Sequence, residues 1–174
     1  QLIDYDIVIW NTGHETANTL TAVDQGNLVK FLTDTNGGRS LTGSLWLLGQ
    51  GVLGDTNVAS AFKSTYLHLT VASTTEPLTN PLRGNPAHPV AVNWSTDETF
   101  INVTAGGGSW ILAPGTDALS MFDRAGGSDA VSFEDGTLQS RVVTFPWDFS
   151  RISDISVQTD VAFAVVLWMG GLRD

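Results

Sequence analysis

The sequence predicts one α/β domain in which helices flank a mostly parallel β-sheet. Two apolar, strand-like runs, Tyr5–Trp10 and Ser44–Leu48, lead directly into polar, glycine-containing turns. A stretch with helically spaced apolar residues follows each run. Strands and helices that alternate across short turns are typical of a parallel sheet with right-handed crossovers. The 174 residues fit a single domain spanning 1–174.

The first third of the chain has the pattern strand, helix, strand, helix. The first strand is apolar on both faces apart from Asp6, which predicts that helices cover both of its sides. Thr21 and Asp24 have the spacing of a capping box at the start of the first helix. The glycines in 36–38 predict its end. The predicted elements are a strand at 5–10, a helix at 20–32, a strand at 44–48 and a helix at 55–66.

Residues 77–115 are predicted to form an irregular, β-rich insertion that lies over the sheet. This segment holds five of the six prolines and three consecutive glycines at 106–108. Short β-prone pieces occur at 89–94, 100–104 and 110–112. Because loops on a rigid scaffold often carry function, the segment is either an interaction surface or a lid without a partner.

The last third is predicted to contain three strands and a long helix. Glu134-Asp-Gly136 is a hairpin turn signal. The predicted strands are 118–123, 130–133 and 141–145, and the predicted helix is 153–170. The helix residues expected to face the sheet are Ile155, Ala162, Val165, Val166 and Met169.

The composition excludes several classes of function. The chain carries 18 acidic and 8 basic residues, a net charge of −10, which disfavours nucleic-acid binding because such affinity comes largely from Lys and Arg. The longest apolar run, Val161–Met169, is far below the roughly 20 residues of a membrane span. A surface built mainly from Thr, Ser, Asn, Asp and Gly suits an extracellular protein, so we expect secretion with a removed targeting segment.

Several stretches resemble the class I glutamine amidotransferase-like superfamily, which has a flavodoxin-like fold. They are YDIVIWNTG, LTAVDQGNLVKFL, LWLLGQGV, FKSTYLHL, DAVSFEDG and RVVTFPWDFSRI, in the order and spacing of that superfamily. The similarity covers most of the chain except 77–115. It is closest to the non-catalytic type found within large secreted bacterial proteins, including multidomain peptidases. The resemblance implies a pseudoenzyme that serves as a structural or interaction module in a larger extracellular assembly.

The positions that carry catalysis in that superfamily are replaced here. Catalytic members have a cysteine between glycines at a sharp turn, where this chain has Gln50 between Gly49 and Gly51. A glutamine amide is neither nucleophilic nor ionisable, so acyl-enzyme chemistry cannot begin there. The activating His-x-Glu pair is replaced by the segment 146–148, in which only the acid Asp148 remains. We therefore expect no amidotransferase activity and no cofactor. The turn is either a vestigial ligand pocket or simply a tight connection.

Superfamily members also have a strand and a helix before the segment that matches 5–10. A flavodoxin-like sheet has the strand order 2-1-3-4-5, so the loss of this unit would leave backbone groups unpaired. We expect another protein chain, or another segment of a longer parent protein, to complete the sheet.

Two sets of residues are candidates for a functional site. Asn11, Gly13 and Gln50 are candidates for binding at the strand ends, and His14, Glu15 and Asp148 would be the machinery of an unusual hydrolase if they converge in a pocket. The alternative for the His-Glu pair is a solvated loop. Three tryptophans outside the main apolar runs could stack on a glycan or anchor a partner chain, or simply pack half-buried; they are Trp94, Trp110 and Trp147.

The sequence contains no complete metal-binding motif. His68 and His88 lack the spacing of a zinc motif. Asp34 begins a segment like an EF-hand loop, but the final glutamate is absent, so a turn is expected. Calcium at Asp123 or Asp129 is left open, and no metal is assigned. The segment 106–109 lacks the lysine of a phosphate-binding loop.

Overall fold

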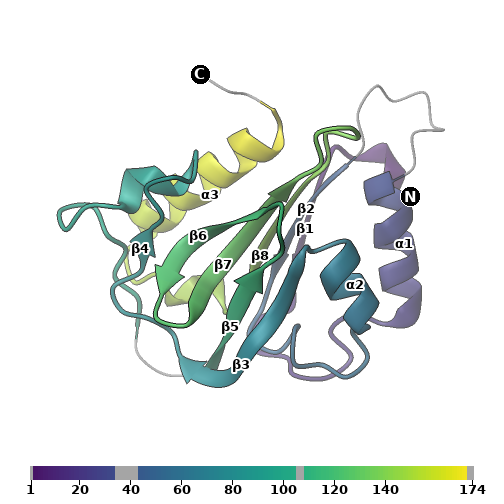
Figure 1. Cartoon of the computed structure of the whole chain (residues 1–174), viewed down its shortest axis with the longest axis horizontal. Helices are drawn as coiled ribbons and strands as arrows, with labels where there is room; N and C mark the ends of the chain where they lie inside the picture. Colours follow the sequence, from purple (N-terminus) through teal and green to yellow (C-terminus); the bar gives the residue numbers. More distant parts are fainter. Residues whose placement is uncertain (1, 34–42, 105–107, 172–174) are drawn as a thin grey trace.

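A computed structural model describes residues 2–33, 43–104 and 108–171, and shows a mixed α/β fold with one open eight-stranded sheet (Figure 1). The strands are β1 (Ile7–Asn11), β2 (Ser44–Leu48), β3 (Leu69–Pro77), β4 (Arg83–Gly84), β5 (Gly108–Pro114), β6 (Ala118–Arg124), β7 (Gly127–Glu134) and β8 (Arg141–Phe145). The helices are α1 (Ala22–Thr33), α2 (Ser60–Thr65) and α3 (Ile155–Met169), and the short 3-10 helices are η1 (Leu2–Asp4), η2 (Ala91–Trp94) and η3 (Phe149–Arg151). None of the helices in the described residues has the length and apolarity of a membrane span.

The sheet is mostly antiparallel, so the predicted mostly parallel sheet is wrong. The main order is β1-β2-β8-β7-β5-β3, with β6 paired to β7 and β4 paired to β6. Of the strand pairs in the described part of the chain, β1–β2 and β2–β8 are parallel and the others are antiparallel. The physical reason is that β6, β7 and β8 follow one another through short turns, which permit antiparallel hairpins but not crossover connections.

Two hydrophobic cores lie on opposite faces of the sheet. Figure 1 shows α1 and α2 on one side and α3 on the other. The first core includes Leu28 and Phe62, and the second includes Val161 together with Trp46 of β2. Every residue of β2 and β8 is buried because each strand is covered on both faces.

β1 is an edge strand, which corrects the prediction that it lies between helices. Of the strands in the described ranges it pairs with β2 alone, and Ile9 is 53% exposed. The sheet is continuous from β1 to β3 within this chain, so the expected gap inside it does not occur. Among the described strands, none pairs with the outer side of β1.

The start of α1 follows the predicted capping box. The Thr21 N–H donates to the Asp24 carboxylate at 2.9 Å, and the Asp24 N–H donates to Thr21 Oγ1 at 3.2 Å. These reciprocal bonds satisfy donors that a helix start leaves unpaired. The stop signal at 36–38 and the EF-hand-like segment from Asp34 lie outside the described residues.

The helix predicted at 55–66 is shortened to α2. Asp55 is buried, and its Oδ2 accepts from the N–H and the hydroxyl of Thr19 at 2.7 and 2.8 Å. Its Oδ1 accepts from the Asn57 N–H at 2.9 Å. An aspartate that bonds the backbone in this way stabilises a turn in competition with a helix.

The segment 77–115 is only partly an insertion. β5 pairs with β3 and β7 and so belongs to the main sheet, and the sequence reading missed β3. The segment 89–94, predicted as a strand, contains the 3-10 helix η2. The segment 100–104 forms no strand and contributes isolated β-bridges through Ile101 and Val103. The segment 77–115 does cover one face, because Leu82, Trp94 and Ile101 join the core beneath α3.

The predicted elements of the last third are confirmed as β6, β7, β8 and α3. Asp154 caps α3 by accepting from the Ser156 N–H at 2.8 Å. Val165 and Met169 are buried as expected. Ile155 is 73% exposed, so its placement on the sheet-facing side is wrong.

Candidate functional site at the strand ends

The carboxyl ends of the three parallel strands lie together at one end of the sheet, which is distinct from the open edge along β1. β1, β2 and β8 run in the same direction in adjacent positions. The turns that follow them therefore lie side by side. These turns carry His14, Gln50 and Asp148, so the structure brings together three of the residues singled out in the sequence.

His14 contacts both of the other side chains. Its Nε2 lies 2.8 Å from Asp148 Oδ2, and its Nδ1 lies 3.3 Å from Gln50 Oε1. The His14 side chain is 67% exposed, whereas that of Asp148 is 10% exposed. A carboxylate can only accept, so His14 Nε2–H donates to Asp148. The cluster therefore has a buried acid and a solvent-facing imidazole.

Arg151 is a fourth member that the sequence reading missed. Its Nη2 donates to Gln50 Oε1 at 3.4 Å. Asp148 caps η3 by accepting from the Ser150 N–H at 2.9 Å, and Arg151 ends that single turn. The available signal was the spacing of three residues between Asp148 and Arg151, which one helical turn brings to the same side.

The backbone of the turn at Gln50 is occupied by contacts within the chain. The Gln50 N–H donates to Gly13 O at 2.9 Å. The Gln50 carbonyl accepts from the Trp110 indole N–H at 3.0 Å. Both backbone polar groups of Gln50 are therefore used in holding this turn against the turn after β1 and against β5.

The two glycines beside Gln50 are required by the packing of the chain itself. A Cβ on Gly49, which has φ +139°, would lie 1.9 Å from Thr12 Oγ1. A Cβ on Gly51 would lie 2.2 Å from Glu15 O. The loop after β1 thus occupies the space that these glycines leave free.

The remaining predicted residues at this end of the sheet have separate roles. Asn11 Oδ1 accepts from the Gly13 N–H at 2.9 Å and so stabilises the turn after β1. Glu15 is exposed, and its side chain makes no hydrogen bond or ion pair with the described residues. Glu15 is therefore not brought into the cluster of His14, Gln50 and Asp148.

The three tryptophans do not form an exposed stacking surface. Trp147 is fully buried, and its indole N–H donates to Asp129 O at 2.8 Å. Trp94 is 9% exposed and packs against Phe122. Trp110 is half-buried and bonded to the Gln50 carbonyl. Of the alternatives considered for Trp94 and Trp147, packing within the chain is the one that their burial fits, since neither presents a free ring face.

A buried pair of side chains, His88 and Ser132, lies outside the cluster at the strand ends. His88 Nε2 is 2.7 Å from Ser132 Oγ, and His88 Nδ1 accepts from the N–H groups of Val90 and Ala91 at 3.1 Å each. Because Nδ1 accepts, Nε2 carries the hydrogen and donates to the serine. A catalytic base must do the opposite, so this pair is structural. Burial lowers the pKa of His88 to about 4.

The acidic residues considered for calcium are engaged within the chain. Arg124 Nη1 donates to Asp129 Oδ1 at 2.8 Å, and burial raises the pKa of this fully buried Asp129. Asp123 Oδ1 accepts from the Ser120 hydroxyl at 2.6 Å. Across the described ranges, no group of three or more His, Asp or Glu side chains is arranged to hold a metal ion.

The two members of the ion pair are expected to differ in their effect on stability. The His14→Ala variant should change the free energy of unfolding by less than about 0.5 kcal/mol, because exposed ion pairs contribute little. The Asp148→Ala variant should lose roughly 1 to 2 kcal/mol, because it also removes the cap of η3. Urea unfolding followed by tryptophan fluorescence measures both. Equal losses would contradict this division of roles.

Comparisons with known proteins support the fold alone. No protein-family model matches the chain, and no curated protein matches it significantly. Among solved structures, the chain is similar to a cytoplasmic protein, STM3548 from Salmonella typhimurium, with 14% identity, a TM-score of 0.64, and coverage of 97% of this chain and 73% of that chain. It is also similar to the mmIFT52 N-terminal domain, with 10% identity, a TM-score of 0.60, and coverage of 97% and 78%.

Proposed function

We propose that the chain is a non-catalytic interaction module whose open β1 edge receives an extended segment of another polypeptide. The observation that carries this proposal is the free edge itself. Thr12 N–H donates to Leu48 O and Ser44 N–H donates to Asp6 O, so the even-numbered residues of β1 bond to β2. In a parallel pair the alternate residues point away, which leaves the backbone groups of Ile7 and Ile9 directed outwards.

An apolar strip beside this edge supports the proposal. A Cβ on Gly170 would lie 3.9 Å from Ile7 Cδ1, so this side of α3 adjoins β1. Phe163 precedes Gly170 by seven residues and therefore lies on the same side of the helix. Phe163 is 64% exposed and Ile9 is 53% exposed. A strand added to β1 would cover both side chains.

The expected occupant is an apolar, extended segment with basic flanking residues. Main-chain pairing at a sheet edge selects an extended backbone, and alternate side chains supply the apolar contact. The net charge of −10 favours a basic partner over a second copy of this chain. Such a segment could belong to a separate protein or to a longer parent chain.

The turn at Gln50, whose backbone groups are hydrogen-bonded within the chain, supports the non-catalytic part of the proposal. Its side chain lacks a nucleophilic atom, and its backbone N–H bonds Gly13 O. The amidotransferase-like, flavodoxin-like assignment is supported by this glycine-flanked turn at the end of β2 and by the polar turns on the neighbouring parallel strands. An extracellular location is also proposed, and the composition alone supports it.

A peptide-binding experiment tests the open edge. The probe is a labelled nine-residue peptide of alternating valine and threonine with two lysines at each end, and the readout is fluorescence anisotropy. The Ile9→Lys variant should weaken binding roughly tenfold or more, because it places a charge where the peptide packs. The Phe163→Glu variant tests the adjoining helix.

The matched control for the edge variant is Val23→Lys. Val23 is 72% exposed on α1, on the opposite face, and its replacement changes the net charge equally. Binding should be unchanged in this control. Equal weakening by Ile9→Lys and Val23→Lys would show a charge effect alone and would contradict the proposal. A dimer in sedimentation that Ile9→Lys dissociates would instead identify a second copy as the occupant and overturn the choice of partner.

A hydrolase is the second candidate function, favoured by the 2.8 Å contact between His14 and Asp148. The test is turnover of p-nitrophenyl acetate by the unmodified chain and by His14→Ala. We expect equal rates, because no hydroxyl or thiol is bonded to His14 among the described residues. A large loss of activity in His14→Ala would overturn the non-catalytic assignment.

A further inference from the structure

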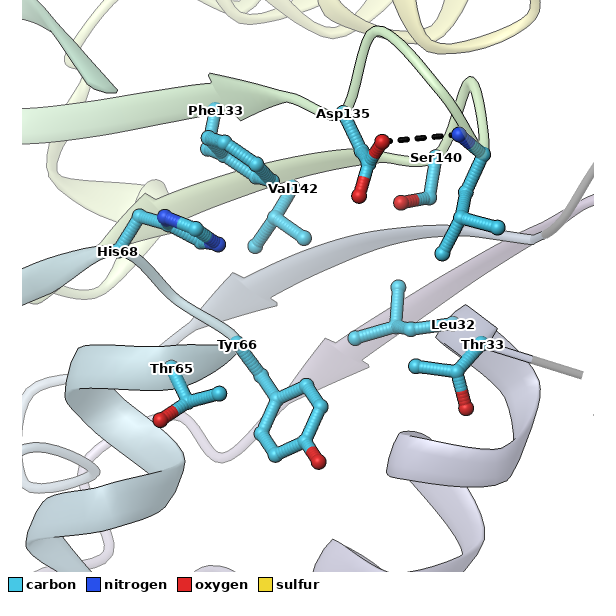
Figure 2. Close-up of a pocket in the computed structure, with 10 residues that line it drawn as sticks. Leu32, Thr33, Thr65, Tyr66, His68, Phe133, Asp135, Ser140 and Val142 are labelled. Carbon is cyan, nitrogen blue, oxygen red and sulfur yellow. Dashed lines mark hydrogen bonds between the residues drawn. The ribbon is translucent and has the colours of Figure 1, made fainter. Parts of the chain in front are cut away.

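A pocket lies at the opposite end of the parallel strands from His14 (Figure 2). It is bounded by the carboxyl ends of α1 and α2, by the end of β7 and by the turn before β8. The cavity has a volume of about 90 Å³. Leu32 and Val142 form its apolar part, and because typical ligand pockets measure about 300 to 1,000 Å³, only a ligand of a few non-hydrogen atoms fits here.

Aromatic rings form one wall of the pocket. Figure 2 shows the ring of His68 against that of Phe133, with Tyr66 on the neighbouring wall. The centroids of the first two rings are 3.3 Å apart, and the ring planes are nearly parallel at 9°. His68 has a φ of +51°, which is unfavourable for a residue with a side chain. Asp117 Oδ1 lies 3.2 Å from His68 Nδ1 and holds the ring in place.

Among its described lining residues the pocket carries one carboxylate, that of Asp135. Asp135 Oδ1 accepts from the N–H groups of Thr137 and Leu138 at 2.7 and 2.8 Å, which holds the carboxylate in the turn before β8. Its other oxygen makes no hydrogen bond with the described residues. The carboxyl end of α1 adds partial negative charge. The described lining contains no lysine or arginine.

Several hydroxyl groups of the pocket are available to a ligand. Thr65, Tyr66 and Ser140 line it, and their hydroxyls make no hydrogen bond within the described part of the chain. Each hydroxyl oxygen can accept from an N–H donor. Figure 2 shows the Ser140 hydroxyl beside the Asp135 carboxylate, so a ligand with N–H groups would find acceptors on the sheet side of the pocket.

We propose that this pocket binds a small organic ammonium ion. A cation is attracted to the faces of aromatic rings, and Tyr66 provides such a ring here, whereas His68 covers one face of Phe133. The Asp135 carboxylate supplies the opposing charge, and the Ser140 hydroxyl accepts from an N–H group of a primary ammonium ion. Anionic ligands are disfavoured by the same charges, and a neutral ligand would forgo the ionic contact.

The test is a titration of the isotopically labelled full chain, followed by backbone amide NMR shifts. The probes are ethylammonium chloride and tetramethylammonium chloride, with tert-butanol as a neutral probe of similar shape and sodium chloride as the ionic-strength reference. We expect saturable shifts near Leu138 and Ser140 with the ammonium salts alone. Tighter binding of ethylammonium would support N–H contacts, and tighter binding of tetramethylammonium would support ring contacts.

Asp135→Asn is the decisive variant, because the amide oxygen can still accept from the turn while the charge is lost. Affinity for both ammonium ions should fall roughly tenfold or more. Asp97→Asn is the control: Asp97 pairs with Arg83 on the surface and is not part of the pocket lining, and its removal changes the net charge equally. Shifts that sodium chloride or tert-butanol reproduces, or equal affinities of Asp135→Asn and the unmodified chain, would overturn the proposal.

Discussion

The Trp147→Ala variant is expected to lose about 4 kcal/mol of unfolding free energy. Trp147 is fully buried and stacks on Phe145 with ring centroids 4.9 Å apart. Its removal leaves a cavity that the sheet cannot fill, and it leaves the Asp129 carbonyl without its indole donor. Urea unfolding followed by the remaining tryptophan fluorescence measures the loss.

Trp147→Phe separates the two contributions. Phenylalanine retains most of the packing but no N–H group, so the loss should be smaller, roughly 1 to 2 kcal/mol. Trp147 directly precedes Asp148, so the alanine variant should also disturb the contact between Asp148 and His14. A loss below about 1 kcal/mol in Trp147→Ala would show that Trp147 is not the anchor of this turn.

Acidification from pH 7 to pH 4 is expected to remove about 3 kcal/mol of stability through His88 alone. Burial lowers the pKa of folded His88 to about 4 from an ordinary value of 6.5. Between these values the unfolded chain binds a proton that the folded chain does not. Stability therefore falls as pH drops through this range, and this contribution levels off below pH 4.

The difference between the unmodified chain and His88→Gln isolates this effect. Carboxylates titrate in both proteins and cancel in the difference, including Asp129, whose burial-raised pKa acts with the opposite sign. Glutamine stays neutral, so the stability advantage of the unmodified chain at pH 7 should shrink by about 3 kcal/mol at pH 4. Parallel curves of stability against pH for the two proteins would contradict a buried, neutral His88.

Local signals predicted most of the helices and strands. The capping box of Thr21 and Asp24 marks the start of α1 correctly, and the turn signal at 134–136 separates β7 from β8. The direction of the strands was not predictable in the same way. The turn signal at 134–136 predicted the β7–β8 hairpin, but the strand–helix alternation of the first third was extended to the whole sheet, where β6, β7 and β8 are antiparallel. Asp55 shows a second limit, because its bonds to Thr19 across the fold stop a helix that the apolar spacing predicts.

The candidate site was partly predictable because the carboxyl ends of adjacent parallel strands lie at the same end of the sheet. That rule alone places His14, Gln50 and Asp148 together. Burial was harder to predict, since Trp147 and Trp94 look like loop residues in the sequence but lie in the core. The exposure of Ile9 was missed for the converse reason: an apolar strand has the same pattern at the edge of a sheet as at its centre.

The position of β8 between β2 and β7 has a consequence for how the chain folds. The Arg141 N–H donates to Ser44 Oγ across 97 residues, so the inner side of β2 is paired only after β8 has been synthesised. Contacts between such distant residues slow folding, because a long loop must close before they form. During synthesis β1 and β2 emerge well before β8. Until then, the backbone groups on the β8 side of the apolar strand β2 have no strand to pair with. Nascent chains of intermediate length are therefore the species most prone to aggregate.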